Sequence, residues 1–409
     1  MTQKRPARAR AALAATLALL LAGCGGGGGG TSAPIAPIAP IAQATRVDLL
    51  ATAARGIESI AFDGDTAYAA LSNSAGEGTA VLKTALPLRA DARWSELALG
   101  GCALPKSDGS MPLRAPGLRT LGSSLWLFQP WYDDAASAGQ HALCLLDASR
   151  STFVARDQAL AACAGGYCST LWMSDLQQAG NRLYTNAGAG TNLFVSGDGA
   201  ASWRVLLGQF DAMICTHSAF GIVGDRVLVG GECPLDMAFI RAYRLSADGL
   251  ALASSEPLPL TLPNLENRNV QFIQAVAGSQ RVFAGVEGGL LRSEDGGRSF
   301  KFVIEEPVEG NKHYPYIGAF LALSTTPDTL VVGGFDKATG KPYLAWSADG
   351  GAKWTDISAL LPGYVRAADA PSAGVVTAIV EDPQGRIVVA VNEREHADGR
   401  MLLLTLAKP

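Results

Sequence analysis

Along most of the chain, short apolar stretches alternate with small or polar turn residues. Seven times, an apolar stretch, a turn and a second apolar stretch follow one another, with turns centred at Gly64, Ser123, Gly180, Gly224, Ser279, Asp328 and Gly385. This pattern predicts β-hairpins, because Gly, Asn and Asp tolerate the backbone angles of tight turns. Successive turns lie 44 to 59 residues apart, the extremes being Gly180 to Gly224 and Gly64 to Ser123. Each interval leaves room for two further strands.

A four-stranded unit repeated in this way predicts an all-β fold, a seven-bladed β-propeller, with six blades as the alternative. The last repeat supplies only three apolar stretches, at 375–382, 386–391 and 401–407. A fourth candidate, residues 46–51 (RVDLLA), precedes the first hairpin. We therefore expect this N-terminal strand to close the last blade, which leaves the ring without a free edge.

The N-terminus has the pattern of an export signal. Lys4, Arg5, Arg8 and Arg10 precede an apolar run at 11–22. A basic segment before a short apolar run is typical of a signal peptide, and this run is shorter than the ~20 residues that cross a bilayer. Residues 21–24 (Leu-Ala-Gly-Cys) resemble the bacterial lipoprotein box, in which the cysteine becomes the acylated first residue. The resemblance implies a signal peptide at 1–23 and lipidation of Cys24; an ordinary signal peptide with a coincidental cysteine is the alternative.

The segment after Cys24 predicts a tether. Residues 25–30 are all Gly, and residues 34–42 repeat Pro-Ile-Ala three times. Gly-rich chain is flexible and Pro-spaced chain favours polyproline II, so residues 24–44 build no core. In the lipoprotein family, Asp after the cysteine retains the protein in the inner membrane, so Gly25 favours the outer membrane. We expect a lipid-anchored protein of the cell envelope, with the propeller at 45–409.

The net charge limits the kinds of partner that are expected, and the number of cysteines indicates disulfides. Without the four basic residues of 1–23, the 33 Lys and Arg fall to 29, against 37 Asp and Glu, for a formal charge of −8. This acidic balance argues against a nucleic-acid partner. Six cysteines follow Cys24, and an even number in an exported chain favours disulfides.

Spacing and elimination give the expected cysteine pairs. One pair encloses a four-residue loop, a second lies symmetrically about the turn at Gly224, and the third pair remains. Free or metal-binding thiols are the alternative. The four His are scattered and no Cys-x-x-Cys is present, so we expect no metal and no cofactor. The expected pairs are Cys163–Cys168, Cys215–Cys233 and Cys102–Cys144.

Three turn segments share the form Ser-x-Asp-Gly followed by an aromatic residue. They are Ser196, Asp198 and Trp203; Ser293, Asp295 and Phe300; and Ser347, Asp349 and Trp354. They resemble the Asp-box (BNR) repeat of sialidase-like and photosystem-assembly-factor-like propellers, which lies between the third and fourth strands of a blade. The resemblance implies a structural role: the carboxylate accepts hydrogen bonds from its own turn and the aromatic ring packs between sheets. Ser246 and Asp248 form a decayed fourth copy.

In such propellers the hairpin turns and the boxes lie on one face, and sialidase-like enzymes use the opposite face. Aromatic rings beside carboxylates and Arg suit a sugar or a peptide ligand, although ordinary polar loops are the alternative. The candidate ligand-face residues are Trp131, Tyr132, Asp133, Asp134, Arg268, His313, Tyr314, Tyr316, Asp336, Glu393 and Arg394.

No catalytic residue can be assigned from the sequence. The Phe/Tyr-Arg-Ile-Pro motif of sialidases is absent, as are the nucleophile-elbow, phosphate-loop and His-Glu-x-x-His patterns. We expect a membrane-anchored, non-catalytic binding, scaffold or assembly module of the cell envelope, with an envelope protein or a glycan as partner. A carbohydrate-active hydrolase of the sialidase-like Asp-box group is the alternative. A closed ring needs no second subunit, so a monomer is expected.

Overall fold

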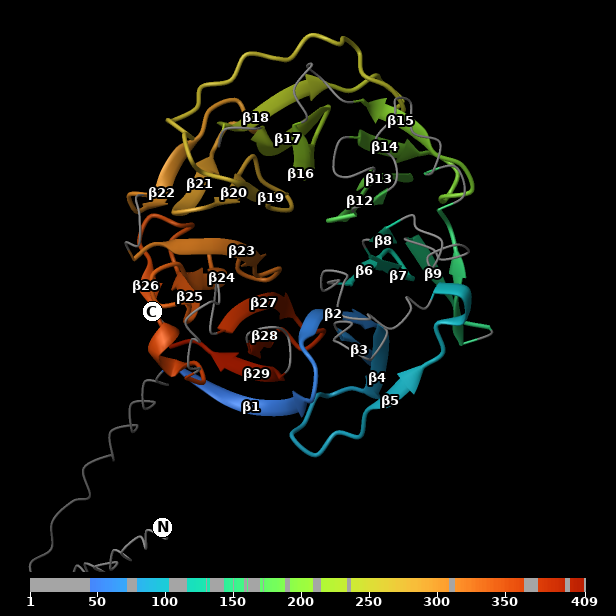
Figure 1. The fold of residues 1–409 in the computed structure, drawn as a ribbon, viewed down its shortest axis with the longest axis vertical. Helices are drawn as coiled ribbons and strands as arrows, with labels where there is room; N and C mark the ends of the chain where they lie inside the picture. Colours follow the sequence, from blue (N-terminus) through green and yellow to red (C-terminus); the bar gives the residue numbers. More distant parts are fainter. Residues whose placement is uncertain are drawn as a thin grey trace, which may run out of the picture. The chain divides into compact units, whose positions relative to one another are not determined.

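The structure is a computed structural model. It describes residues 45–71, 79–102, 116–129, 131–132, 143–149, 151–157, 160, 170–171, 173–187, 192–208, 215–233, 237–308, 313–363, 374–393 and 398–407. Residues Gln43–Pro409 form one compact unit. Within this unit, seven antiparallel sheets are arranged in a ring, so the seven-bladed β-propeller is confirmed (Figure 1).

The first strand of each blade lies nearest the axis and the later strands lie progressively further out (Figure 1). Blade 1 consists of β2 (Ile57–Asp63), β3 (Thr66–Leu71), β4 (Ala80–Ala85) and β5 (Ser95–Leu97). Blade 2 consists of β6 (Gly117–Leu121), β7 (Ser124–Phe128), β9 (Leu143–Asp147) and β10 (Thr152–Ala155). Blade 3 consists of β12 (Leu176–Ala179), β13 (Arg182–Ala187), β14 (Asn192–Ser196) and β15 (Arg204–Leu207). Between β7 and β12, β8 (Trp131–Tyr132) pairs with β11 (Thr170–Leu171), and a 3-10 helix at Gly100–Cys102 follows blade 1.

Blades 4 to 7 continue the ring in the same order. Blade 4 consists of β16 (Thr216–Val223), β17 (Arg226–Cys233) and β18 (Met237–Arg244), and blade 5 of β19 (Val270–Ala275), β20 (Val282–Val286), β21 (Gly289–Ser293) and β22 (Lys301–Glu305). Blade 6 consists of β23 (Pro315–Ala322), β24 (Leu330–Asp336), β25 (Pro342–Ser347) and β26 (Thr355–Asp356). Blade 7 consists of β27 (Gly374–Glu381), β28 (Ile387–Glu393), β29 (Gly399–Thr405) and β1 (Arg46–Ala53). A second 3-10 helix spans Ser358–Leu360.

The core lies between neighbouring blades rather than within one blade. The second strands are buried on both faces, as the fully buried pattern of β20 illustrates. One apolar cluster joins Leu228 and Ile240 of blade 4 to Val282 and Leu291 of blade 5. Each blade therefore depends on two neighbours for the burial of its apolar faces.

The first strands of adjacent blades are also joined by hydrogen bonds from short polar side chains. The Ser59 hydroxyl in blade 1 accepts a hydrogen bond from the backbone N–H of Leu118 in blade 2 at 3.0 Å. The Ser218 hydroxyl donates to the Val270 carbonyl of blade 5 at 2.8 Å, and Thr377 of blade 7 donates to a blade 1 carbonyl at 2.6 Å. Such side chains satisfy backbone groups that an inner strand cannot pair within its own sheet.

The N-terminal strand closes the ring, as the sequence predicts. β1 pairs antiparallel with β29, with Arg46 opposite Thr405 and Ala53 opposite Gly399. A register shift occurs between Leu49 and Ala51, and Leu50 lies in the core between blades 7 and 1. Closure joins the two ends of the domain in one four-stranded sheet, with β1 as its outer strand.

Blade 4 departs from the expected four strands. Beyond β18, the chain makes only scattered backbone contacts with it, including Ala253 N–H to the Arg244 carbonyl and Leu258 N–H to the Ala242 carbonyl. Pro257 and Pro259 lie in this segment. Leu258 between them donates to β18, so the two proline nitrogens face away from that strand, as proline does at the edge of a sheet.

Two of the three expected disulfides are present, and both fix a blade. Cys215 and Cys233 face each other across the β16–β17 hairpin with their Cα atoms 4.1 Å apart. Cys102 and Cys144 link the 3-10 helix after blade 1 to β9 of blade 2. Cys163 and Cys168 lie outside the described residues, as does Cys24.

The Ser-x-Asp turns lie between the third and fourth strands of blades 3, 5 and 6, with a related turn after β18. In the first copy, the Ser196 hydroxyl donates to Asp198 at 2.8 Å, and Asp198 accepts the backbone N–H of Ser202 at 2.9 Å. The indole of Trp203 donates to the Arg156 carbonyl of blade 2 at 2.9 Å. Ala200 has φ of 68° where the other two copies have Gly. The Ser and Asp hydrogen bonds stabilise the turn itself, and the Trp203 hydrogen bond links the first copy to the preceding blade.

We predict that deleting residues 45–52 from the full chain opens the ring and lowers its melting temperature, measured by circular dichroism. A matched pair tests the same contact more gently. Leu50→Ala removes a side chain only 8% exposed, so we expect a loss of about 2 kcal/mol or more in the free energy of unfolding. Leu49→Ala, at a side chain 54% exposed, should stay within about 0.5 kcal/mol. A deletion variant as stable as the parent protein contradicts closure by β1.

A second prediction concerns acid stability. Hydrogen bonds from the Ser202 hydroxyl and backbone lower the pKa of Asp198 to about 2. Because this pKa is lower in the folded state, the ionised carboxylate stabilises the fold at neutral pH, and that contribution is lost as the pH falls from about 4 towards about 2. Asp198→Asn should therefore make the melting temperature less steep in this range. The exposed Asp91→Asn serves as control; equal curves for both variants would refute the prediction.

Candidate binding site

The seven first strands enclose a channel along the axis of the ring. Two adjoining cavities occupy it, with volumes of about 550 and 500 Å³. The larger opens where the first strands begin, beside Glu58, Gln271 and Tyr316, and we call this side the mouth face. The smaller opens on the turn face, which carries the hairpin turns, beside Ser324 and Asp382. The predicted division into two faces is therefore present.

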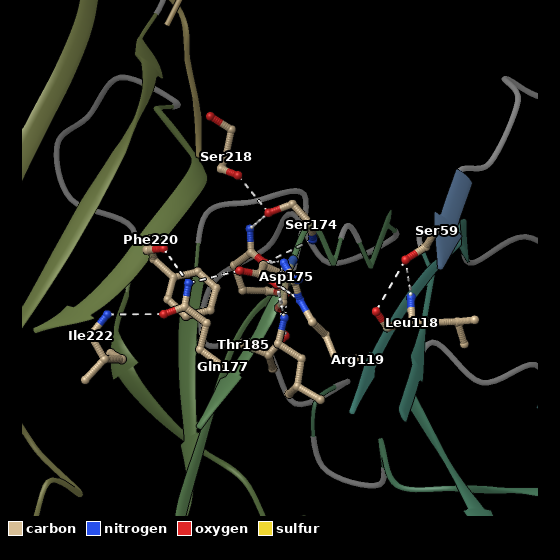
Figure 2. Close-up of polar contacts among 12 residues, drawn as sticks. Ser59, Leu118, Arg119, Ser174, Asp175, Gln177, Thr185, Ser218, Phe220 and Ile222 are labelled. Atoms are coloured by element: carbon tan, nitrogen blue, oxygen red, sulfur yellow. Dashed lines mark hydrogen bonds and ion pairs between the residues drawn. The ribbon is translucent and has the colours of Figure 1, made fainter. Parts of the chain in front are cut away.

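A polar network joins the inner strands of blades 2, 3 and 4 beside the channel (Figure 2). The carboxylate of Asp175 accepts a hydrogen bond from Arg119 Nε at 3.0 Å and another from Gln177 Nε2 at 2.9 Å. The Gln177 amide also donates to the Phe220 carbonyl at 2.8 Å and accepts the backbone N–H of Ile222 at 3.2 Å. Both polar atoms of the Gln177 side chain thus hydrogen-bond to blade 4. They link blade 3 to blade 4 and order this side of the channel wall.

Deeper in the same wall, Asn186 continues the network. Its amide nitrogen donates to the Ser174 hydroxyl at 2.6 Å and to the His217 carbonyl at 2.9 Å. The Ser174 hydroxyl donates in turn to the Ser218 carbonyl at 2.7 Å (Figure 2). Burial, with a smaller effect from Arg241, lowers the pKa of His217 to about 4. The imidazole is therefore neutral at neutral pH, and it adds no charge to the wall.

A second cluster of polar and aromatic residues lies on the mouth face over blades 4, 5 and 6. The Tyr314 hydroxyl donates to Glu287 Oε1 at 2.8 Å, and the Gln271 amide donates to the Tyr316 hydroxyl at 2.8 Å. The Lys337 ammonium lies 4.0 Å from Glu287 Oε1. We call the set the Glu287 cluster: Glu232, Asn269, Gln271, Glu287, Tyr314, Tyr316 and Lys337.

The tyrosines of the Glu287 cluster are held as neutral phenols. Burial raises the pKa of Tyr316 to about 12, with further contributions from Glu287 and Glu232. Burial and the hydrogen bond to Glu287 raise the pKa of Tyr314 well above its usual value. A phenol with a raised pKa donates hydrogen bonds but is a poor nucleophile. The arrangement therefore suits binding better than covalent catalysis by tyrosine.

Several candidate ligand-face residues support the cluster from below. Tyr314 is only 4% exposed and Arg268 only 7%. The Arg268 guanidinium donates to the Glu287 and Glu306 carbonyls at 3.2 and 3.1 Å and lies 4.6 Å from the Phe302 ring centre. Sequence alone does not reveal that these two long side chains are buried, because both occur in polar loops.

Other candidates lie at the margin of the cluster. His313 is exposed, and its Nδ1 lies 3.2 Å from Asp336 Oδ1. Asp336 ends β24 and Glu393 ends β28. Trp131 and Tyr132 form β8, but their side chains lie outside the description, and Asp133, Asp134 and Arg394 lie outside the described residues.

Sequence reasoning missed the acidic residues at the centre of the site. Glu232 is the last residue but one of β17, and Glu287 follows β20 directly. Together with Asp336 and Glu393, they place an acidic residue at or next to the end of the second strand in four consecutive blades. An apolar run closing on a carboxylate, repeated four times, was the available signal. It places all four acids on the mouth face.

No family model matches this chain, and no curated protein matches its sequence. Solved structures do match. The chain is similar to YCF48 bound to D1 peptide (11% identity, TM-score 0.50, 90% of this chain and 96% of that chain). It is also similar to YCF48 from Cyanidioschyzon merolae (10%, 0.50, 88% and 98%) and to U3-55K (12%, 0.53, 88% and 98%). At these identities, the likeness establishes the propeller fold alone.

Two features of the described residues limit what the site can be. No helix there is long and apolar enough to span a membrane. In the same part of the chain, no group of three or more His, Cys, Asp or Glu side chains is placed to hold a metal ion.

We predict that Glu287 and Tyr314 are energetically coupled. Glu287→Leu leaves the buried Tyr314 hydroxyl without its acceptor, so we expect a loss of about 1–3 kcal/mol in the free energy of unfolding. Tyr314→Phe removes that hydroxyl, so the double variant should cost less than the sum of the single variants. Urea unfolding of the full chain measures all three. Strict additivity would show that the hydrogen bond contributes nothing.

Proposed function

We propose that the protein is a non-catalytic binding propeller of the cell envelope, anchored through a lipid on Cys24, that presents its mouth face to another envelope protein. The observation that carries this proposal is the Glu287 cluster. Side chains from three blades meet there, already hydrogen-bonded to one another, with His313 and Lys337 accessible at the edge. A site ordered before its partner arrives loses less conformational entropy on binding.

The chemistry of the mouth face favours binding over hydrolysis. The two tyrosines nearest the carboxylates have raised pKa values, and Tyr314 is buried. Aromatic surface is present too, since the rings of Tyr316 and Phe335 are stacked with centres 5.0 Å apart. Aromatic anchors rimmed by polar groups are typical of protein-binding patches.

Resemblance adds support of a weaker kind. The Ser-x-Asp turns resemble Asp-box repeats, and one propeller of the same fold, YCF48, has been solved with a D1 peptide bound. We infer by analogy that this chain also binds a polypeptide segment, acting as a scaffold or assembly module. Gly25, where lipoproteins of the inner membrane carry Asp, favours the outer membrane as its location.

Crosslinking tests the partner proposal. The full-length protein is expressed in its own envelope, crosslinked, solubilised in detergent and captured, and partners are quantified by mass spectrometry. Lys337→Glu on the mouth face should reduce a specific crosslinked partner at least about tenfold, as expected when a charge at an interface is reversed. Lys353→Glu, the same change in an exposed turn on the opposite face, should leave that partner unchanged.

Two outcomes would reject this function. If Lys337→Glu and Lys353→Glu retain the same partners equally, the mouth face is not the docking surface. If the purified protein instead cleaves glycans on an array, the hydrolase alternative replaces the binding proposal.

The anchor is tested separately. We predict that Cys24→Ser moves the protein from the membrane fraction to the soluble fraction, because acyl chains contribute about 0.8 kcal/mol per buried CH₂ to membrane binding. The N-terminal peptide of the parent protein should carry the acyl mass. Unchanged membrane association of Cys24→Ser would contradict lipidation at this residue.

A further inference from the structure

Among the described residues that line the channel, Arg119 is the one basic side chain, and its setting is largely apolar. Seven residues line both cavities and mark the place where they meet: Ile60, Leu118, Arg119, Gln274, Phe320, Ile379 and Val380. Five of them are apolar, and Arg119 and Gln274 are the polar pair. Cavities of about 300–1,000 Å³ with apolar walls and few polar groups are typical of small-ligand sites.

Arg119 keeps donors available to a ligand. Its Nε and Nη2 atoms lie 3.0 and 2.9 Å from the same carboxylate oxygen, Asp175 Oδ1 (Figure 2). Both contacts use one side of the planar guanidinium, so Nη1 and the second N–H of Nη2 remain on its end. No described residue accepts a hydrogen bond from Nη1, and the side chain is 49% exposed. An end-on guanidinium is suited to a carboxylate, which it can bind through two parallel hydrogen bonds.

Asp175 holds the guanidinium in place. This carboxylate also accepts the backbone N–H of Leu176 at 2.9 Å and the amide of Gln177 at 2.9 Å. Asp175 is therefore fixed by its own strand, and Arg119 is fixed by Asp175. The negative charge of Asp175 also weakens the attraction of Arg119 for a second anion. Removing that charge should therefore strengthen the binding of an anionic ligand.

The remaining charges along the channel limit what can bind. The carboxylates lining the two cavities are engaged: Glu58 with the Asn392 amide at 3.1 Å, Glu381 with the Ser324 backbone N–H at 2.6 Å, and Asp382 with Arg386 at 2.6 Å. They lie towards the two ends of the channel, so a polyanion meets like charge on either side of Arg119. A single carboxylate on an apolar body avoids that repulsion.

We propose that the channel is a binding site for an organic monocarboxylate with an aromatic or aliphatic body. Its carboxylate pairs with the free end of Arg119, with the Gln274 amide within the same narrow part of the channel. Its apolar body packs against Phe272 and Phe320, whose ring centres lie 5.7 Å apart. Gln271 and Tyr316 of the Glu287 cluster also line the larger cavity, but Arg119 and Gln274 lie where the two cavities meet, and the proposal does not depend on the protein-binding function.

Ligand-observed NMR with the purified full-length protein tests the ligand class. The probe is 4-phenylbutyrate, and its uncharged counterpart 4-phenylbutyramide has the same body. The carboxylate should bind at least about tenfold more tightly than the amide, the usual effect of one charge-assisted hydrogen bond. Absence of binding by 4-phenylbutyrate, or equal affinity for the two probes, overturns the proposal.

Two variants test the residues in opposite directions. Arg119→Gln should weaken 4-phenylbutyrate binding about tenfold or more and leave the amide unchanged. Asp175→Asn keeps hydrogen-bonding oxygen beside Arg119 but removes the competing charge, so it should tighten carboxylate binding several-fold. Unchanged affinity in Arg119→Gln, or weaker binding in a folded Asp175→Asn, contradicts the assignment. Melting temperatures establish that each variant is folded.

A third variant tests the location without altering charge. A Cβ added at Gly318, which lines the larger cavity, meets no atom within 4 Å, so Gly318→Leu introduces a bulky side chain into the cavity from an open position. It should abolish binding of both probes. Gly363→Leu is the matched control, since a Cβ there also meets nothing within 4 Å and the residue lies outside the channel lining. Binding that survives Gly318→Leu places the probes elsewhere and rejects the channel site.

Discussion

The pairing of β1 with β29 is the constraint on which the rest of the structure depends. A blade buries its apolar faces only against the blades on either side, so an open ring leaves two blades half covered. β1, the first strand of the described chain, completes blade 7 at the far end of the sequence. Closure also brings the Thr377 hydroxyl to the Ile57 carbonyl and the Asn392 amide to the Ile57 N–H, at 2.6 and 2.7 Å. These bonds join the last blade to the first across 320 and 335 residues of sequence.

Closure also sets the candidate sites, because neither belongs to one blade. The Glu287 cluster takes residues from blades 4, 5 and 6, and the channel wall takes Arg119 from blade 2 and Asp175 from blade 3. The distances between these side chains depend on the angle at which neighbouring sheets pack. That angle is fixed by buried side chains between sheets, and by residues such as Gln177 that bond to two blades at once. Stability of the ring and order at the sites therefore have the same physical origin.

Local rules predict the local features well. Gly224 has φ of 60° in the β16–β17 turn, as a tight hairpin requires, and this turn brings Cys215 to Cys233. Strand alternation and turn chemistry thus predict the hairpins, the closing strand and the Cys215–Cys233 pair, whereas Cys102–Cys144 is expected only by elimination. Blade 4 differs, since beyond β18 the chain makes only isolated backbone contacts where a fourth strand was expected. The site was harder to predict, because burial of Tyr314 and Arg268 depends on contacts with distant strands. The acids ending four second strands were visible in the sequence, but their convergence required the ring.

The closing strand also determines the face on which the chain enters the domain. β27 begins on the mouth face, and the antiparallel order β27–β28–β29–β1 places Gly399 and Ala53 at that end and Arg46 and Thr405 at the turn-face end. Residue 45 therefore joins the ring on the turn face, at the outer strand of blade 7. The Glu287 cluster lies on the opposite face, over blades 4 to 6. The point at which the described chain enters the domain and the Glu287 cluster thus occupy different faces of the ring.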